Sequence, residues 1–428
     1  MKVAFYTLGC KVNTYETEAI WQIFNDKGYE RVSFDEQADI YIINTCSVTN
    51  KADSKSRKMI RKATRMNKNA VVAVMGCYSE HKYEEISKIE GVSVVIGTEN
   101  KKQIVDLIEE YLQTKKQIVN VLKLTNKFEN INALEFEHTR AFLKIQDGCE
   151  NYCTFCIIPL LRGKLRSRDK LSTLEEARNI VKHGYKEIVL TGIHTGAYGV
   201  DLEDYSFEEL ISDLLEINGL ERLRISSIEI NQITDKILHT IKNNTKMAHH
   251  LHLPIQSGSN SVLKRMGRKY TLDEYIDKIN YIRKIVPDIA ITTDVIVGFP
   301  GETEEEFKET INTINQIKFS QLHVFPYSKR DNTRAARMIN QVNEKIKNDR
   351  VDVLIKLSEK LNLEYANKFI NKPLYYIPET KYDENKLIGH TSNYLKVIIN
   401  GDENLIGKNL KIEILQPVYP NSIGKIIE

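Results

Sequence analysis

The sequence predicts an α/β protein with three parts: a parallel α/β domain, a closed or partial barrel of about six βα units, and a small β-barrel. Three observations predict this. Short β-branched runs alternate with helical periods over residues 1–115, and the alternation resumes after Arg140. The last sixty or so residues contain only short alternating runs between turn residues. A length of 428 residues agrees, because it is too long for one compact core.

Composition excludes several classes of protein. A chain that is 41% apolar and 28% charged, with 20 glycines and 9 prolines, is neither disordered nor fibrous. No stretch approaches the roughly 20 apolar residues that cross a bilayer, and the first residues lack a signal sequence. We therefore expect a cytoplasmic protein without a membrane partner. The formal charge of +3 does not by itself demand nucleic acid. Six cysteines in such a chain favour metal binding or catalysis over disulfides.

The first domain brings three cysteines to comparable positions. Its expected strands are residues 3–8, 40–44, 71–75 and 92–96, with helices from about residues 14 and 52. Cys10, Cys46 and Cys77 each come within about two residues of a strand end. Ligands bind at the carboxyl edge of such sheets, so the three thiols could converge on one metal site. The alternative is three buried, inert cysteines, because free cysteine is often buried.

The remaining segments follow in order. Residues 116–137 are predicted to be a linker with room for an edge strand, residues 138–366 a barrel domain and residues 367–428 a small β-barrel. The expected barrel strands are residues 141–145, 187–190, 223–228, 251–255, 289–297 and 321–325. A helix over residues 343–369 carries the apolar stripe Val353, Leu354, Leu357 and Leu361. The expected C-terminal strands are residues 374–377, 394–399, 410–415 and 422–427.

The strongest chemical signal is the loop that contains Cys149, Cys153 and Cys156, directly after an expected strand. Structural zinc normally takes four ligands, whereas three thiolates from one loop suit a [4Fe-4S] cluster with one iron left free. A zinc site completed by a distant histidine such as His194 is the alternative. Two later strand exits are rich in glycine, and Gly192, Gly298 and Gly301 would let a ligand approach the backbone closely.

Taken together, these motifs resemble the radical S-adenosylmethionine methylthiotransferase family along the whole chain. The landmarks are TLGCKVNTYETE, NTCSVT, MGCYSE, GCENYCTFCIIP, LRGKLRSR, HLPIQSGSN and VIVGFPGET, in that order. The resemblance implies a central partial (β/α)6 barrel of radical S-adenosylmethionine type and a C-terminal barrel similar to the RNA-binding TRAM domain. One departure is Asn332, which stands where the family pattern has glycine.

The resemblance also implies cofactors and site residues. Cys149, Cys153 and Cys156 would hold the catalytic [4Fe-4S] cluster, whose free iron binds S-adenosyl-L-methionine and whose reduction cleaves it to a 5'-deoxyadenosyl radical. Cys10, Cys46 and Cys77 would hold an auxiliary [4Fe-4S] cluster that carries the sulfur to be inserted. The residues implied to bind S-adenosylmethionine are Phe155, Thr191, Gly192, Gln256, Gly298 and Gly301.

The expected substrate is tRNA, and the expected reaction is methylthiolation at carbon 2 of N6-threonylcarbamoyladenosine at position 37. Lys11 and Val12 follow the first cysteine where the isopentenyladenosine branch usually has glutamine and methionine, and residues 145–147 also resemble the threonylcarbamoyl branch. A threonylcarbamoyl group carries a carboxylate that a cationic site could pair with, whereas an isopentenyl group needs an apolar pocket. Arg162, Arg166 and Arg168 are candidate partners for that carboxylate or for phosphates.

Other partners and alternatives complete the expectation. A basic run on the helix after Cys46 is a candidate phosphate-binding surface: Lys51, Lys55, Arg57, Lys58, Arg61, Lys62, Arg65 and Lys68. A reductant such as flavodoxin or ferredoxin is a second expected partner. The alternatives are methylthiolation of isopentenyladenosine or of a ribosomal protein side chain, and a non-enzymatic iron-sulfur protein that binds RNA. A corrin site is disfavoured because the first domain lacks a DxHxxG pattern.

Overall fold

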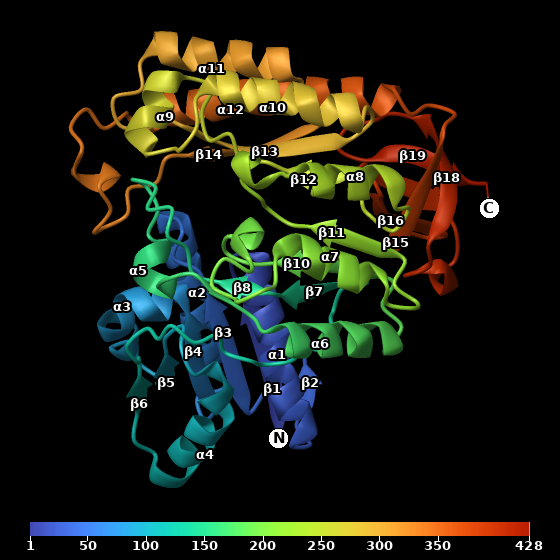
Figure 1. Ribbon diagram of the computed structural model, residues 1–428. Coiled ribbons are helices and arrows are strands. Elements are labelled where there is room, and N and C mark those ends of the chain that lie inside the picture. Colours follow the sequence, from blue (N-terminus) through green and yellow to red (C-terminus); the bar gives the residue numbers. More distant parts are fainter. Residues whose placement is uncertain (428) are drawn as a thin grey trace.

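The structure is a computed structural model that describes residues 1–427, and its N-terminal part is a six-stranded parallel sheet (Figure 1). The strand order is β2-β1-β3-β4-β5-β6. Its strands are β1 (Lys2–Thr7), β2 (Glu30–Val32), β3 (Ile40–Thr45), β4 (Val71–Gly76), β5 (Val92–Ile96) and β6 (Ile118–Asn120). Residues 116–137 were predicted to be a linker with room for an edge strand, and β6 is that strand.

Helices cover both faces of this sheet, which is why β3, β4 and β5 are buried along their whole length. The helices are α1 (Lys11–Asp26), α2 (Asn50–Met66), α3 (Cys77–Ser87) and α4 (Ile104–Thr114). Apolar residues of α1 and α4 pack on one face, and those of α2 and α3 pack on the other. Helix α1 begins at Lys11, three residues before its expected start, because Cys10 is its N-cap residue.

The central part contains six parallel strands in two three-stranded sheets, in the orders β11-β10-β7 and β12-β13-β14. They are β7 (Arg140–Lys144), β10 (Glu187–Thr191), β11 (Arg222–Ile225), β12 (His250–His252), β13 (Ala290–Val297) and β14 (Gln321–Pro326). Isolated parallel bridges connect the two sheets at Leu223 with Met247 and at Ser227 with His252. Strands β11 and β12 end earlier than expected, because only such isolated bridges follow them.

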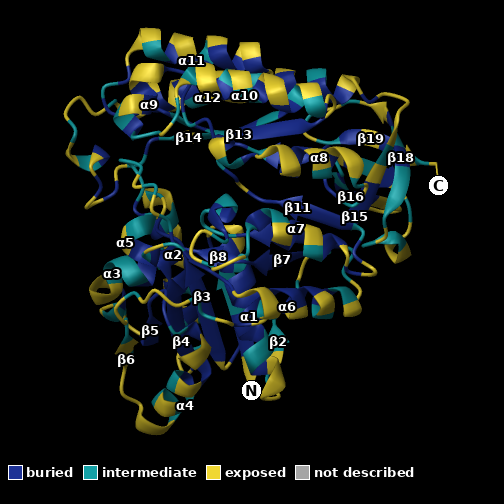
Figure 2. Ribbon diagram, in the orientation of Figure 1, coloured by how far each residue is buried: buried dark blue, intermediate teal, exposed yellow. Residues whose placement is uncertain are grey.

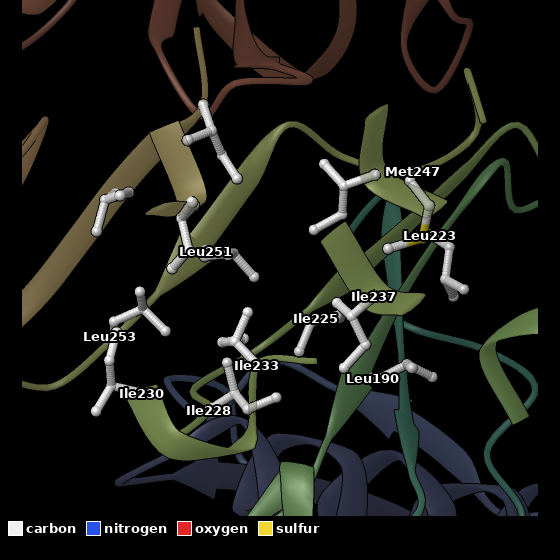
Figure 3. Close-up of a cluster of buried hydrophobic side chains, with 14 of the residues drawn as sticks. Leu190, Leu223, Ile225, Ile228, Ile230, Ile233, Ile237, Met247, Leu251 and Leu253 are labelled. Atoms are coloured by element: carbon white, nitrogen blue, oxygen red, sulfur yellow. The ribbon is translucent and has the colours of Figure 1, made fainter. Parts of the chain in front are cut away.

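One hydrophobic core fills the space between these strands and their helices (Figure 3). Leu190, Leu223 and Ile225 come from the strands, and Ile237 and Met247 meet them from the segment that follows β11. The helices are α5 (Ile158–Arg162), α6 (Lys170–Lys182), α7 (Phe207–Leu215), α8 (Asp235–Asn243), α9 (Asn260–Met266), α10 (Leu272–Ile285), α11 (Glu304–Ile317) and α12 (Glu344–Asn367). Their outward faces are exposed, whereas the strands are buried (Figure 2).

Helix α12 packs along β14, but the expected apolar stripe is partly wrong. Leu354 and Leu361 are buried, whereas Val353 is 45% exposed. The buried face instead continues through Arg350 and Ser358, which keep the spacing of three or four residues. These polar residues are buried because they have partners: Arg350 pairs with Glu302, and Ser358 accepts from the backbone of β14.

The C-terminal strands form a closed barrel in the order β15-β16-β17-β19-β18. They are β15 (Pro373–Asp383), β16 (Lys386–Thr391), β17 (Lys396–Asn400), β18 (Leu410–Gln416) and β19 (Ser422–Ile426). Strand β16 was missed in the sequence, because Gly389 interrupts its pattern. A Cβ at Gly389 would lie 2.0 Å from the Ile377 carbonyl oxygen, so glycine permits the close approach of two strands. Over residues 1–427, no helix has the length and apolarity to span a membrane.

Candidate active site

The sheet edge brings the first cysteine triad together. Cys10 caps α1, Cys46 follows β3, and Cys77 begins α3 directly after β4. Each thiol lies close enough to the other two for their charges to interact. A Cβ at Gly9 would lie 2.9 Å from the Cβ of Cys46, so this turn requires glycine. The triad therefore converges as expected from the carboxyl ends of parallel strands.

Two of these thiols are held in a poorly solvated environment. Cys46 and Cys77 are buried, whereas Cys10 is exposed. Burial raises the pKa of Cys46 to about 12, and the neighbouring Cys77 adds to the shift. Burial also raises the pKa of Cys77, although the nearby Arg162 opposes this. A cationic cluster would favour the thiolate form of all three.

Arg162 ties this triad to the central sheet. Its Nε donates to Sγ of Cys77 at 3.4 Å, and its Nη1 lies 2.9 Å from Oε1 of Glu16 and 3.1 Å from Oδ2 of Asp147. Burial would lower the pKa of Arg162, but Asp147, Cys77 and Glu16 together raise it. Lys144 pairs with the same two carboxylates at 2.7 and 2.6 Å. This buried ionic network fixes α1, α5 and the end of β7 to one another.

The expectation that Arg162, Arg166 and Arg168 contact the substrate is therefore corrected. All three are buried and paired: Arg166 with Glu99 at 3.0 Å, and Arg168 with Glu176. The arginines of LRGKLRSR form ion pairs in the interior because this segment crosses between the N-terminal and central sheets. Lys164 is the exposed cation of this run.

The second triad occupies the loop that follows β8 (Gln146–Asp147). Cys149, Cys153 and Cys156 are all partly exposed, and burial raises the pKa of Cys156 to about 12. A Cβ at Gly148 would lie 1.9 Å from the Lys164 carbonyl oxygen, so glycine is required where the loop starts. Arg268 donates from Nη1 to Sγ of Cys153 at 3.3 Å. No sequence motif had indicated Arg268.

Neither triad has the geometry of a single-ion site. Within residues 1–427, no three cysteine, histidine or carboxylate side chains are close enough to hold one metal ion. His194, the candidate fourth zinc ligand, contacts the amide of Asn151 at 3.5 Å instead. A cubane separates its three thiolate ligands by the width of the cluster, so two sets of three cysteines fit [4Fe-4S] clusters better than zinc.

A cavity of about 500 Å³ lies between the two triads. Cys10 and Cys46 line it from one side, and Cys156 lines it from the other. Its remaining wall is mostly apolar and comes largely from the central strands: Gln256, Asp294, Ile296, Phe325, Pro326 and Tyr327. A small molecule in this cavity would therefore contact residues of both triads, shielded by apolar side chains.

The residues implied to bind S-adenosylmethionine fall into two groups. Phe155 and Gln256 line the cavity, and Gln256 has a left-handed φ of +67°. Thr191 and Gly192 end β10, where a Cβ at Gly192 would lie 2.9 Å from Oε1 of Gln146.

The backbone amides of Gly298 and Gly301 were expected to be free for a ligand, but both already donate hydrogen bonds within the protein. The amide of Gly298 donates to Glu302, and that of Gly301 donates to the Asn340 carbonyl oxygen at 2.8 Å. Both glycines have left-handed φ values, which explains their residue type. Their role in binding S-adenosylmethionine stays a prediction.

The loop with the unusual Asn332 joins the central part to the N-terminal sheet. Asn332 has a φ of +69°, which asparagine tolerates better than most residues, so it can replace the expected glycine. In the same loop, Arg330 lies 2.7 Å from both Ser47 and Asp53 beside Cys46.

The basic run on α2 lies on the surface as expected. Met59, Ile60 and Ala63 face the sheet, while the exposed members of the run are Lys51, Lys55, Lys58, Arg61, Arg65 and Lys68. Arg57, Arg61, Arg65 and Lys68 line an open groove of about 780 Å³. Arg57 also contacts Tyr78 and Glu85.

Two family models match separate parts of the chain. Residues 2–97 match the uncharacterized protein family UPF0004, and residues 143–314 match the radical SAM superfamily. The structure is similar to that of the radical S-adenosylmethionine methyltransferase TsrM from Kitasatospora setae, with a TM-score of 0.58, 11% identity and coverage of 78% of this chain and 77% of that one. At this identity, the likeness concerns the fold alone.

Relatives of known activity match almost the whole chain. The threonylcarbamoyladenosine tRNA methylthiotransferase MtaB of Bacillus subtilis is 51% identical over 99% of this chain and 96% of its own length. The protein of that name from Aquifex aeolicus is 40% identical over 97% and 100%. The tRNA-2-methylthio-N(6)-dimethylallyladenosine synthase of Thermoanaerobacter pseudethanolicus is 36% identical over 99% and 92%. With two cysteine triads around one cavity and such relatives over its full length, this chain belongs to the radical S-adenosylmethionine tRNA methylthiotransferase family.

Proposed function

We propose that this protein transfers a methylthio group to carbon 2 of N6-threonylcarbamoyladenosine at position 37 of tRNAs that read codons beginning with A. The single observation that carries the proposal is the cavity bordered by both cysteine triads. Radical formation and sulfur delivery must meet at one substrate atom, and Cys10, Cys46 and Cys156 surround one space where they can. The 51% identity to MtaB favours threonylcarbamoyladenosine over the isopentenyl base.

The cysteines supply the ligand sets for two [4Fe-4S] clusters. Cys149, Cys153 and Cys156 would hold the catalytic cluster, and Cys10, Cys46 and Cys77 the auxiliary one. When bound, the clusters supply the electron that cleaves S-adenosyl-L-methionine and the sulfur that is inserted. Phe155, Thr191, Gly192, Gln256, Gly298 and Gly301 are the proposed contacts of S-adenosylmethionine.

The chain's own residues then position the substrate and protect the reaction. Ile296 and Phe325 form an apolar wall that excludes water and competing hydrogen donors from the cavity. The hydrogen bonds from Arg162 to Cys77 and from Arg268 to Cys153 orient one ligand in each triad. The same two arginines pair with carboxylates of the central part, Arg162 with Asp147 and Arg268 with Glu229.

The rest of the chain binds tRNA in this proposal. Residues 1–115 form the auxiliary-cluster domain, residues 116–137 the linker, residues 138–366 the radical S-adenosylmethionine barrel and residues 367–428 a TRAM-like RNA-binding barrel. Separate hydrophobic cores support this division. The exposed cations of α2 would contact phosphates. A tRNA substrate places the enzyme in the cytoplasm, with flavodoxin or ferredoxin as electron donor.

The test is a nucleoside digest of tRNA from cells with and without this protein, analysed by mass spectrometry. The methylthio form of threonylcarbamoyladenosine should disappear without the protein, and its precursor should accumulate. Loss of the methylthio-isopentenyl nucleoside, or of a ribosomal protein modification, with threonylcarbamoyladenosine unaffected would reject the assigned substrate. The catalytic variant Cys153→Ala serves as a control for loss of activity in the presence of the protein.

A further inference from the structure

The loop that follows β14 contacts both cysteine triads. We call residues 327–336 the bridging loop, since they leave the central sheet at the end of β14. Near its start, the loop hydrogen-bonds the segment that follows Cys46. Near its end, Ala335 hydrogen-bonds the loop that holds Cys153 and Cys156. One short segment therefore lies against both ligand sets.

Arg330 makes the main contact beside Cys46. Its Nη2 donates to Oγ of Ser47 and to Oδ2 of Asp53, both at 2.7 Å. Its Nη1 donates to Oδ1 of Asn50, also at 2.7 Å. The guanidinium and the carboxylate of Asp53 are both buried, and hydrogen bonds from an ionised group are stronger than neutral ones. Because Ser47 directly follows Cys46, this contact is attached one residue from a cluster ligand.

Two weaker contacts lie on the same side of the bridging loop. The backbone amide of Asn50 donates to Oγ of Ser328 at 3.0 Å, and Ser328 also lines the cavity between the triads. Lys82 pairs with Asp331 at 3.3 Å, but both side chains are exposed. An exposed ion pair contributes little, so Arg330 and Ser328 provide most of the contact.

The other end of the bridging loop holds the loop triad. The backbone amide of Ala335 donates to the carbonyl oxygen of Thr154 at 2.8 Å. Thr154 lies between Cys153 and Cys156, and its own amide donates to the carbonyl oxygen of Met266 at 2.9 Å. Ala335 is fully buried in one apolar cluster with Met266. The loop triad is therefore held between the end of α9 and the bridging loop.

Hydrogen bonds inside the bridging loop connect its two ends. Oγ1 of the buried Thr333 donates to the carbonyl oxygen of Arg330 at 2.8 Å. The backbone amide of Ala336 in turn donates to Oγ1 of Thr333 at 3.3 Å. The residue that contacts the Cys46 segment is thus bonded to the turn that contacts Thr154.

We propose that the bridging loop, through Arg330, positions the strand-end triad relative to the loop triad, so that radical formation stays coupled to sulfur insertion. Arg330 is a positioning residue, and the inference rests on the proposed function. Hydrogen abstraction and sulfur transfer must occur at one carbon, and a small misplacement of reacting groups lowers a rate by large factors. When Arg330 is lost, the radical takes its hydrogen atom from another C–H bond, and 5'-deoxyadenosine forms without product.

The first experiment measures coupling in the cluster-loaded protein. The substrate is an anticodon stem-loop whose threonylcarbamoyladenosine carries deuterium at C2. Arg330→Met should raise the ratio of 5'-deoxyadenosine to methylthio nucleoside at least about tenfold over wild type, and lower the deuterated fraction of the 5'-deoxyadenosine. Arg330→Lys, which keeps the charge but cannot make all three contacts, should show a smaller change. A reduced fraction of active protein leaves both ratios unchanged.

The matched control is Lys82→Met. This variant removes the exposed ion pair of the same loop and should keep both wild-type ratios. Iron is measured for every variant, because loss of the auxiliary cluster would also uncouple the reaction. Coupling is therefore compared only between proteins that hold about eight irons.

The second experiment does not depend on activity. Hydrogen exchange of the cluster-loaded protein, without S-adenosylmethionine, reports on the Asn50 amide that Ser328 accepts. Arg330→Met should make this amide exchange about 10- to 100-fold faster, because the segment beside Cys46 loses its charged contact. Amides in the buried strand β3 should keep their wild-type rates, which shows that the sheet stays folded. Lys82→Met should leave all of these rates unchanged.

The outcomes distinguish this inference from the proposed function. A fully loaded Arg330→Met protein with wild-type coupling would overturn the role of Arg330 and leave the function intact. If Arg330→Met does not load both clusters, Ser328→Ala replaces it, since this change removes only the acceptor of the Asn50 amide. Wild-type coupling in a loaded Ser328→Ala protein would then overturn the inference. If the wild type forms no methylthio product on this stem-loop, the proposed function fails, and exchange at Asn50 still decides whether the bridging loop holds the Cys46 segment.

Discussion

The two cysteine triads border one cavity but are assembled in different ways. Cys149, Cys153 and Cys156 lie in one loop, whereas Cys10, Cys46 and Cys77 come from the ends of three strands. Each triad receives one hydrogen bond from an arginine, at 3.4 Å from Arg162 and 3.3 Å from Arg268. The difference teaches that a local loop needs only its own sequence to gather three ligands, whereas the other triad depends on the whole N-terminal sheet.

The largest expected effect is at the loop triad. Cys153→Ala should abolish the formation of 5'-deoxyadenosine from S-adenosylmethionine on reduction, because it removes a ligand of the proposed catalytic cluster. Product formation is measured by liquid chromatography after anaerobic reconstitution, with Cys46→Ala as the matched control. Full cleavage activity in Cys153→Ala, or stoichiometric zinc with only traces of iron in the wild type, would contradict the assignment.

The strand-end triad should show a partial effect. Cys46→Ala should retain 5'-deoxyadenosine formation but lose sulfur insertion, because the loop triad has its own ligands. Iron content should fall from about eight atoms per chain to about four. If a folded Cys46→Ala protein also loses all cleavage of S-adenosylmethionine, the two triads are not independent.

The two arginines should differ in their contribution to stability. Arg162→Met leaves the buried carboxylates of Glu16 and Asp147 short of a cation, and should lower the free energy of unfolding by about 3–5 kcal/mol. Arg268→Met should cost less, about 1–3 kcal/mol, because its partner Glu229 is partly exposed. Urea unfolding of the metal-free proteins measures both, with the exposed Lys27→Met as control. Equal losses at the two arginines would remove the contrast between the sites.

The smallest expected effect is on thiol reactivity in the metal-free protein. Iodoacetamide should modify the exposed Cys10 before the buried Cys46 at pH 8, as measured by peptide mass spectrometry. Burial raises the pKa of Cys46 to about 12, so its reaction rate should still increase above about pH 10, where an ordinary thiol is already largely ionised. In urea-unfolded protein, the two cysteines should react at similar rates. A Cys46 rate that levels off near about pH 10 in the folded protein would contradict this.

Much of this architecture could be predicted from local sequence patterns. Strand β5 has the expected bounds, and most other strands of the parallel sheets lie within one or two residues of theirs, because buried parallel strands are continuous apolar runs. The CxxxCxxC spacing defined the loop triad without any knowledge of the fold. Strand β16 was missed because Gly389 interrupts its hydrophobic pattern. Glycine is needed there because the backbone of β15 approaches closely.

The sequence by itself determined the chemical class of the protein, since cysteine spacing and strand periodicity are local properties. Only the tertiary structure decided which charges are available to a ligand. Arg162, Arg166 and Arg168 form a basic run in the sequence and are all buried in ion pairs. Whether a charge is neutralised depends on residues distant in the chain, and only the folded structure brings them together.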